Sequence, residues 1–297
     1  GPIQFIHQDV DMSAYEVQLE NKTVKTCKAA LGYAFAAGTT DGPGAKFFHQ
    51  GTHEHESSPF WDTIRNFLKD PSVEMVECQE PKAIILPVGE LMFPYQWTPN
   101  IIPTQLLRIG NVVIAGLPGE FTTMSGRRIR NGIKKEFQKS NQTVHVTLAG
   151  LSNTYSNYIA TFEEYQAQRY EGGSTMFGPH TLDAYLQQFK YLANRMSKND
   201  LKVAPGSEFP NLLDKQLTLH AGVVLDTPPI GKKFGAVVHD VKTDHEYHAG
   251  IDTIEVTFVS GHPRNNLQLE STYLTVEKLG SNSDWKVVAT DANWETK

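Results

Sequence analysis

The stretch LLRIGNVVIAGLPGEFTTMSGRRIRNGIKKEF (106–137) decides how the first two thirds of the chain fold. Its first part has two apolar arms, one on either side of Gly110-Asn111. This pair tolerates the positive φ angles of a tight turn. Residues 106–118 therefore predict a β-hairpin.

A helix is predicted to follow this hairpin directly. Pro118-Gly119 ends the second arm, and Thr122 or Thr123 can cap the first turn of the helix. Beyond the cap, apolar side chains recur near the helical period at Met124, Ile129, Ile133 and Phe137. The junction places Glu120 in the turn between strand and helix.

The segments on either side of this stretch also mix strand and helix. Residues 144–151 alternate like a buried strand and run into a tyrosine-rich segment. Ser58-Pro59 begins an apolar stretch that predicts an N-capped helix over 58–68. The clearest amphipathic spacing comes later, at Leu182, Tyr185, Leu186, Phe189, Leu192, Ala193 and Met196. We expect a mixed α/β domain over residues 1–204.

The character of the chain changes near VAPGSEFPN (203–211), which has the composition of a linker. Three later segments, 251–259, 271–279 and 284–291, alternate at period two between turn signals. This pattern is typical of an antiparallel sandwich or barrel. We expect residues 205–297 to begin an immunoglobulin-like β-sandwich whose sheet continues past Lys297.

Composition excludes several classes of partner. With 27 Lys and Arg against 33 Asp and Glu, the net charge is -6, so we expect no nucleic-acid binding. No run reaches the roughly 18 to 20 apolar residues of a membrane span, and the first residues lack the pattern of a signal peptide. We expect no transmembrane segment within these residues.

The two cysteines, Cys27 and Cys78, are too far apart for a redox C-x-x-C pair. A single disulfide and two unrelated buried thiols both remain open. The N-x-T sequons at Asn21 and Asn141 favour an oxidising compartment. Since G-x-S-x-G, H-E-x-x-H, the P-loop and G-x-G-x-x-G after a strand are all absent, generic motifs assign no reaction.

A more specific signal comes from five segments that resemble the neutral ceramidase family. They are AALGYAFAAGTTDGPG (29–44), PGEFTTMSGRR (118–128), NTYSNYIATFEEYQAQRYEG (153–172), FGPHTL (177–182) and DANWET (291–296). The resemblance runs in order along nearly the whole chain. It implies an amidase that hydrolyses ceramide, N-acylsphingosine, to sphingosine and a fatty acid.

The resemblance also implies a division of the protein. Residues 1–204 would be the C-terminal part of the catalytic domain. The nucleophilic serine and two zinc-binding histidines would belong to an N-terminal half outside these residues. The fragment alone is then expected to be inactive.

Family zinc is held by two histidines, a glutamate and a tyrosine, and the last two resemble Glu120 and Tyr158. Tyr155 competes with Tyr158 as the ligand. Without the resemblance, Glu120 would be an acidic residue in a helix first turn and Tyr158 a core aromatic. Tyr170 resembles a second family tyrosine near the scissile amide, where a phenol can stabilise the oxyanion.

The resemblance extends to structural features. Asp291, Asn293 and Thr296 resemble a calcium site at the start of the terminal β domain, with an Asx-type turn after a strand as the alternative. Together with the sequons, the resemblance implies a Cys27–Cys78 disulfide, glycosylation at Asn21 and Asn141, and passage through the secretory pathway to the cell surface or the exterior.

Two other functions remain open. A secreted adhesion or binding module could have kept the sandwich and lost the site, although the presence of both Glu120 and Tyr158 argues against it. A zinc amidase acting on other N-acyl lipids would share the same residues.

Overall fold

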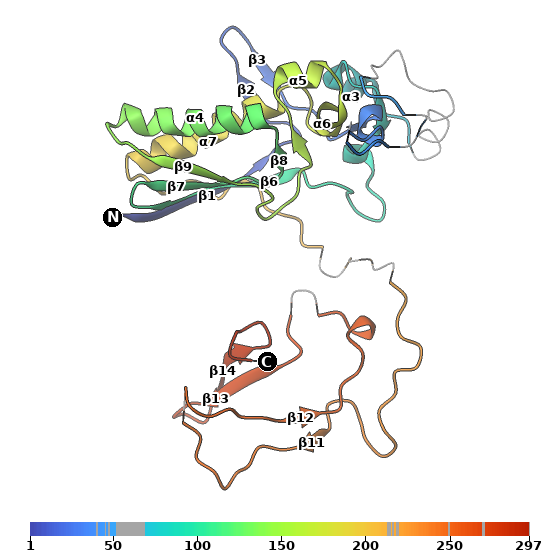
Figure 1. Cartoon of the computed structure of the whole chain (residues 1–297), viewed down its shortest axis with the longest axis vertical. Coiled ribbons are helices and arrows are strands. Elements are labelled where there is room, and N and C mark those ends of the chain that lie inside the picture. Colours follow the sequence, from blue (N-terminus) through green and yellow to red (C-terminus); the bar gives the residue numbers. More distant parts are fainter. Residues whose placement is uncertain are drawn as a thin grey trace. The chain divides into compact units, whose positions relative to one another are not determined.

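The computed structural model describes residues 1–39, 41–44, 46, 48–51, 69–212, 215, 217, 220–248, 250–268 and 271–296. The chain divides into two compact units, Gly1–Pro210 and Asn211–Lys297 (Figure 1). The helix predicted over 58–68 lies outside the described residues.

A four-stranded sheet organises the first unit. It consists of β1 (Ile3–Asp11), β6 (Ile101–Ile109), β7 (Val112–Gly116) and β9 (His145–Ala149), in the order β1-β6-β7-β9. The first two pairings are antiparallel and the last is parallel. The crossover between β7 and β9 is helix α4 (Thr123–Lys139), as a parallel neighbour requires.

The predicted hairpin and helix are both confirmed. Ile109 pairs with Val112 across the turn, and Gly110 has a φ of 61°. Thr122 is the N-cap of α4, and its side chain accepts a hydrogen bond from the backbone N–H of Ser125.

The junction between hairpin and helix differs from the expected turn. Glu120 and Phe121 form a short strand, β8 (Glu120–Phe121), which pairs in parallel with β10 (Tyr158–Ile159). The backbone N–H and C=O groups of this junction need hydrogen-bond partners where water does not reach them. The tyrosine-rich segment 153–172 supplies these partners. Because the paired residues are more than thirty positions apart in sequence, no local sequence pattern predicts this pairing.

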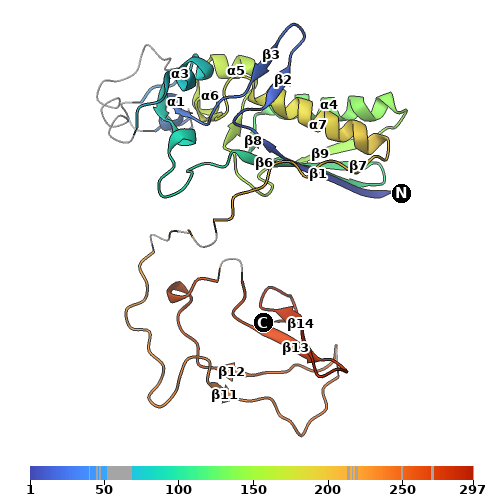
Figure 2. The same ribbon diagram turned by 180° about the vertical axis from the view of Figure 1, so that it is seen from behind.

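Helices α4 and α7 (Thr181–Ser197) lie side by side over one face of the sheet (Figures 1 and 2). The predicted apolar spacing of α7 is confirmed, and it buries Leu182, Tyr185, Phe189, Leu192, Ala193 and Met196. Each large apolar side chain buried in this way stabilises the fold by about 1.5–3 kcal/mol. The core of the first unit therefore lies between these helices and the sheet.

Short elements complete the first unit. The strands are β2 (Glu16–Gln18), β3 (Thr23–Lys25), β4 (Leu31–Gly32) and β5 (Ile84–Leu86). The helices are α1 (Tyr33–Ala36), α3 (Val73–Gln79), the 3-10 turn η2 (Val88–Glu90), α5 (Phe162–Gln166) and α6 (Tyr170–Ser174). No helix in the described part of the chain is long and apolar enough to cross a membrane.

The second unit is built from antiparallel ribbons. β11 (Val237–His239) pairs with β12 (Thr257–Phe258), and β13 (Thr275–Leu279) pairs with β14 (Trp285–Thr290). One 3-10 turn, η4 (Pro263–Asn265), lies between them in sequence. Among the residues described in this unit, Val259 alone is a buried hydrophobic side chain. Predicted strands 271–279 and 284–291 are thus largely formed, whereas only the end of 251–259 is extended into a ladder.

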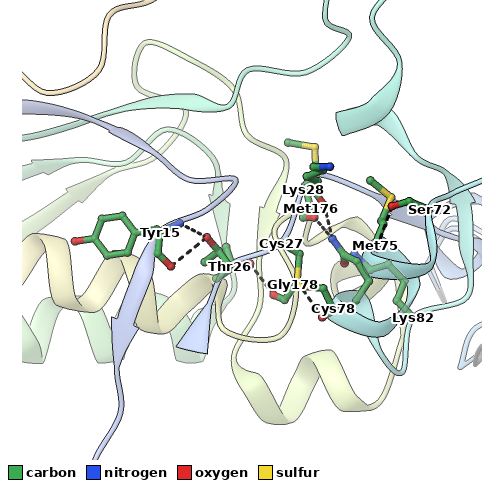
Figure 3. The surroundings of a disulfide bond; sticks show 12 residues. Tyr15, Thr26, Cys27, Lys28, Ser72, Met75, Cys78, Lys82, Met176 and Gly178 are labelled. Atoms are coloured by element: carbon green, nitrogen blue, oxygen red, sulfur yellow. Dashed lines mark hydrogen bonds between the residues drawn. A yellow bond between two sulfur atoms is a disulfide. The ribbon is translucent and has the colours of Figure 1, made fainter. Parts of the chain in front are cut away.

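A disulfide joins Cys27 to Cys78, with a Cα–Cα distance of 5.7 Å (Figure 3). The pairing implied by the resemblance is therefore present. Gly178, with a φ of 83°, packs against it, because a Cβ atom there would lie 2.4 Å from the Cys27 sulfur. Next to the disulfide, the amide of Gln79 donates to the backbone oxygens of Lys28 (2.8 Å) and Met176 (2.6 Å). The bridge ties α3 to the segment between β3 and β4, and the Gln79 amide ties it to that segment and to the one that leads into α7.

Replacing both cysteines by serine should destabilise the first unit by about 4 kcal/mol, because the closed loop of about 50 residues restricts the unfolded chain. Denaturant unfolding would measure the loss, and a reducing agent should no longer affect the variant. Mass spectrometry of a non-reduced digest should give one crosslinked peptide pair. Two free thiols in that digest would contradict the pairing.

Candidate active-site cluster

The β8–β10 pairing sets Glu120 directly beside Tyr158. The two residues are register partners in a parallel ladder, so their side chains leave the sheet on the same face. The backbone N–H of Glu120 donates to the Asn157 oxygen at 2.9 Å, and that of Thr122 donates to the Ile159 oxygen at 3.2 Å. Two residues far apart in sequence are thereby brought into side-chain contact.

Glu120 lies against two phenols. The Tyr155 hydroxyl donates to Oε1 at 2.6 Å. The hydroxyl of Tyr158 also faces this carboxyl group, which raises its pKa. The structure thus brings both candidate tyrosines to the same glutamate, and Tyr155 is the more exposed of the two.

The contact with Glu120 holds the protons on both phenols. Burial, followed by the hydrogen bond to Glu120, raises the pKa of Tyr155 well above its usual value of 10.0. For Tyr158 the order of causes is reversed, since the Glu120 hydrogen bond raises its pKa most and burial comes second. Both phenols are therefore neutral donors around neutral pH.

Tyr170 is the first residue of α6, and its ring packs against the ring of Tyr158 in the same cluster. Its ring centroid is 5.3 Å from that of Tyr158, edge to face, and 6.1 Å from that of Phe35. The structure therefore places all three of the predicted residues Glu120, Tyr158 and Tyr170 together.

The backbone that carries Tyr170 is anchored by Lys82, which is fully buried. Its Nζ donates to the backbone oxygens of Ala30 (3.0 Å) and Thr175 (2.5 Å) and lies 5.0 Å from the Tyr165 ring. Burial lowers the pKa of this amine well below its usual value. Through these two hydrogen bonds, the Lys82 amine connects Thr175, at the end of α6, to Ala30, the residue before β4.

Two further acidic residues belong to the surroundings and were not singled out from the sequence. Glu164 accepts from the Thr122 hydroxyl at 2.7 Å and from the Thr161 backbone N–H at 2.8 Å. The pKa of Glu171 is raised by burial and then by the charges of Glu164 and Glu120. The T-x-x-E spacing from Thr161 to Glu164 is a capping-box signature, so Glu164 could have been identified from sequence.

An open cavity of about 450 Å³ adjoins Glu120 on the side of α4. Its lining combines apolar side chains with two arginines of the helix: Leu117, Phe121, Arg127, Arg130, Leu148 and Leu151. Glu120 is therefore partly exposed and reachable from outside the fold.

The donor chemistry of the cluster is compatible with part of the zinc ligand set that the resemblance implies. Carboxylate oxygen is an ordinary zinc ligand, and a phenolate can serve beside a dication. Glu120 and one of the two tyrosines supply two such oxygens. Within the described residues, no group of three or more His, Cys, Asp and Glu could hold a metal. By their donor chemistry, Glu120 and Tyr158 fit two positions of the ligand set that the resemblance implies.

The predicted calcium residues lie in a turn after β14. Asp291 accepts from the Thr272 hydroxyl and from the Tyr273 backbone N–H, and these bonds lower its pKa. Asn293 accepts from the Thr290 backbone N–H at 2.8 Å. The Asp291 carboxyl is engaged with the segment that precedes β13 and the Asn293 side-chain oxygen with the local turn, so a cation would have to rearrange these bonds.

Both sequon asparagines are exposed. Asn21 lies in the turn between β2 and β3, and Asn141 follows the end of α4 with a φ of 54°. Either side chain is accessible to a bulky modification.

Comparison with known proteins identifies relatives over the whole chain. Residues 1–187 match the family model "Neutral/alkaline non-lysosomal ceramidase, N-terminal", and residues 189–297 match its C-terminal counterpart. The chain is 48% identical to a neutral ceramidase of Oryza sativa subsp. japonica over 100% of its length, and 47% identical to one of Drosophila pseudoobscura pseudoobscura. It spans 38% and 42% of the length of these curated relatives.

Solved structures give the same result. A ceramidase complexed with C2 matches 99% of this chain with 36% identity and a TM-score of 0.65. A neutral ceramidase from Pseudomonas aeruginosa matches 99% with 34% identity and a TM-score of 0.62. The chain covers 45% and 44% of these two structures.

Replacing Glu120 by Gln should lower the pKa of both phenols, and that of Tyr158 more, because the Glu120 hydrogen bond is the largest cause of its shift. NMR of tyrosine ring carbons across pH would measure both values. Glu163→Gln is the control, since Glu163 pairs with Arg128. The stability contributed by the raised pKa values is fully present below about pH 10 and is lost as pH rises above it. A Tyr158 titration unchanged by Glu120→Gln would contradict the contact.

Proposed function

Because the chain belongs to the neutral/alkaline ceramidase family, we propose that it forms part of an amidase that hydrolyses ceramide to sphingosine and a fatty acid. The observation that carries this proposal is the contact of Glu120 with Tyr158, two residues that the resemblance assigns to one site. The presence of both residues argues against a binding module that has lost the site.

We propose that Glu120 and Tyr158 supply two oxygen ligands to a zinc ion. The remaining ligands, two histidines, and the nucleophilic serine lie outside these 297 residues in this proposal. A bound zinc ion would polarise the scissile amide and lower the pKa of a coordinated hydroxyl group. For Tyr158 to bind as phenolate, its proton must leave, and the pKa rise caused by Glu120 makes this binding dependent on pH.

Glu120, Tyr155 and Tyr170 would then have different roles in this part of the site. Glu120 fixes the position of the ligand set, and Tyr155, which donates to its Oε1, holds the carboxyl group in one orientation. Tyr170 contacts the Tyr158 ring and can offer its hydroxyl to the developing oxyanion. The acyl chain preference is set by pocket residues beyond this cluster, so amidase activity on other N-acyl lipids is the second candidate.

In a polypeptide of the relatives' length that contains these residues, Glu120→Ala should abolish zinc retention and ceramide hydrolysis. Tyr158→Phe should keep the fold and impair turnover, because it removes only one oxygen atom. Elemental analysis of the dialysed protein and a ceramide hydrolysis assay would measure both effects, with Glu163→Ala as the exposed control. The 297-residue chain alone should bind zinc weakly and hydrolyse no ceramide. Hydrolysis by the chain alone, or near-normal activity of the Glu120→Ala protein, would overturn the assignment.

We also propose that Asp291, Asn293 and Thr296 bind calcium through hard oxygen ligands, and that the second unit belongs to an immunoglobulin-like sandwich. The two antiparallel ribbons of this unit support the latter proposal. The disulfide and the exposed sequons support a secreted or cell-surface glycoprotein carrying glycans at Asn21 and Asn141.

If calcium binds there, Asp291→Ala should lower the melting temperature only in the presence of calcium, because it removes the linkage between binding and folding. Tryptophan fluorescence would follow the second unit, which contains Trp285 and Trp294. Asp284→Ala provides a matched exposed carboxylate in the same unit. An equal loss with and without calcium would show that Asp291 serves the local turn alone.

A further inference from the structure

Two buried hydroxyl groups connect helix α7 to the backbone beside the Glu120 cluster. The Tyr185 hydroxyl lies 3.0 Å from the Ser156 hydroxyl, which lies 2.8 Å from the backbone oxygen of Pro118. Tyr185 is 0% exposed and Ser156 is 2% exposed. Buried polar groups need hydrogen-bond partners, and in this structure each of these two hydroxyls finds a partner in the next group of the chain.

The proton order along this chain of hydroxyls is fixed. A carbonyl oxygen only accepts, so the Ser156 hydroxyl must donate to Pro118. Ser156 then has no proton left for Tyr185, and Tyr185 must donate to Ser156. The hydroxyls run in one direction, from the helix to the Pro118 carbonyl.

The carbonyl that receives these bonds lies two residues before Glu120. It also accepts the Ser156 backbone N–H at 2.7 Å, and both donors come from the segment that continues into Tyr158. Between them, Gly119 approaches so closely that a Cβ atom would lie 2.6 Å from the Asn157 oxygen. The two segments are thus clamped just before their two-residue ladder begins.

This clamp matters because the ladder itself is too short to fix its own register. β8 and β10 share only the pairs Glu120–Tyr158 and Phe121–Ile159. A slip of one residue would turn Tyr158 to the opposite face and away from Glu120.

We propose that Tyr185 and Ser156 are positioning residues, which hold Glu120 and Tyr158 in register through the hydroxyl chain from α7 to Pro118. This inference rests on the proposed function for its significance, since the register matters only if the pair acts together. Both hydroxyls are buried and lie outside the proposed ligand set.

The test uses Tyr185→Phe in the 297-residue chain with 13C-labelled tyrosine rings. The substitution removes the hydroxyl and keeps the ring, which packs edge to face on Phe121 at 5.2 Å. We expect the NMR signals of Tyr155 and Tyr158 to shift toward those that Glu120→Gln produces, because the Ser156 hydroxyl loses the donor that fixes its orientation toward Pro118 and the clamp beside Glu120 loosens. Tyr155→Phe and Tyr158→Phe assign the two signals.

Tyr165→Phe is the matched control. Tyr165 is also 0% exposed and also donates its hydroxyl, but to Gln79 at 2.7 Å. Its loss should lower the melting temperature by a similar amount and leave the Tyr155 and Tyr158 signals in place. A merely structural role for Tyr185 predicts equal effects of the two substitutions.

Ser156→Ala tests whether the hydroxyls act in series. The Tyr185→Phe/Ser156→Ala double variant should shift the two signals no further than Ser156→Ala alone, because both substitutions break one chain. Unchanged signals in Tyr185→Phe and Ser156→Ala, additive shifts in the double variant, or equal shifts in Tyr165→Phe would each overturn the inference. A zinc titration of the wild-type chain, run separately, tests the proposed metal site, so shifted signals without zinc binding would support the positioning role and contradict only the proposed function.

Discussion

The candidate site depends on a backbone pairing of two residues. Where β8 meets β10, the hairpin that ends at Gly116 is joined to the tyrosine-rich segment, and Glu120 reaches Tyr158. Each of the two paired strands leads into a helix. One continues into helix α4 and the other into the capping box of α5, where Glu164 also binds Thr122. The short ladder is therefore held at its far end by side-chain bonds and at its near end by the bonds to Pro118.

The protonated phenols beside Glu120 are the main chemical feature of the cluster. Each tyrosine is stabilised as a neutral phenol by burial and by the carboxyl group of Glu120. If the proposed zinc ion binds Tyr158 as a phenolate, it must displace a proton whose binding the fold favours. The Tyr155 hydroxyl meanwhile keeps Oε1 of Glu120 hydrogen-bonded within this chain.

Local patterns in the sequence were enough to predict the hairpin, α4 and α7, because each is decided by spacing, turn chemistry and caps within one segment. The ribbons near 271–279 and 284–291 followed from alternation in the same way. The contact of Glu120 with Tyr158 was not accessible from periodicity, since it joins residues 38 positions apart in sequence. Resemblance assigned these two residues and Tyr170 to one site, but the second phenol on Glu120, the buried Lys82 and the hydroxyls of Ser156 and Tyr185 required coordinates. Lys82, Ser156 and Tyr185 are buried polar groups, and the sequence does not indicate which partner any of these groups will find.

The uneven burial in the two units has a calorimetric consequence. The heat-capacity change of unfolding comes mainly from newly exposed apolar surface. In the described part of the second unit that surface is already largely in contact with solvent. Cooperative melting of this chain should therefore show the heat-capacity increment of the first unit alone, about 2.5–3.2 kcal/mol/K for its 210 residues. The second unit would add little to the transition, and its stability must come from bonds at its turns or from surfaces that it acquires in a larger protein.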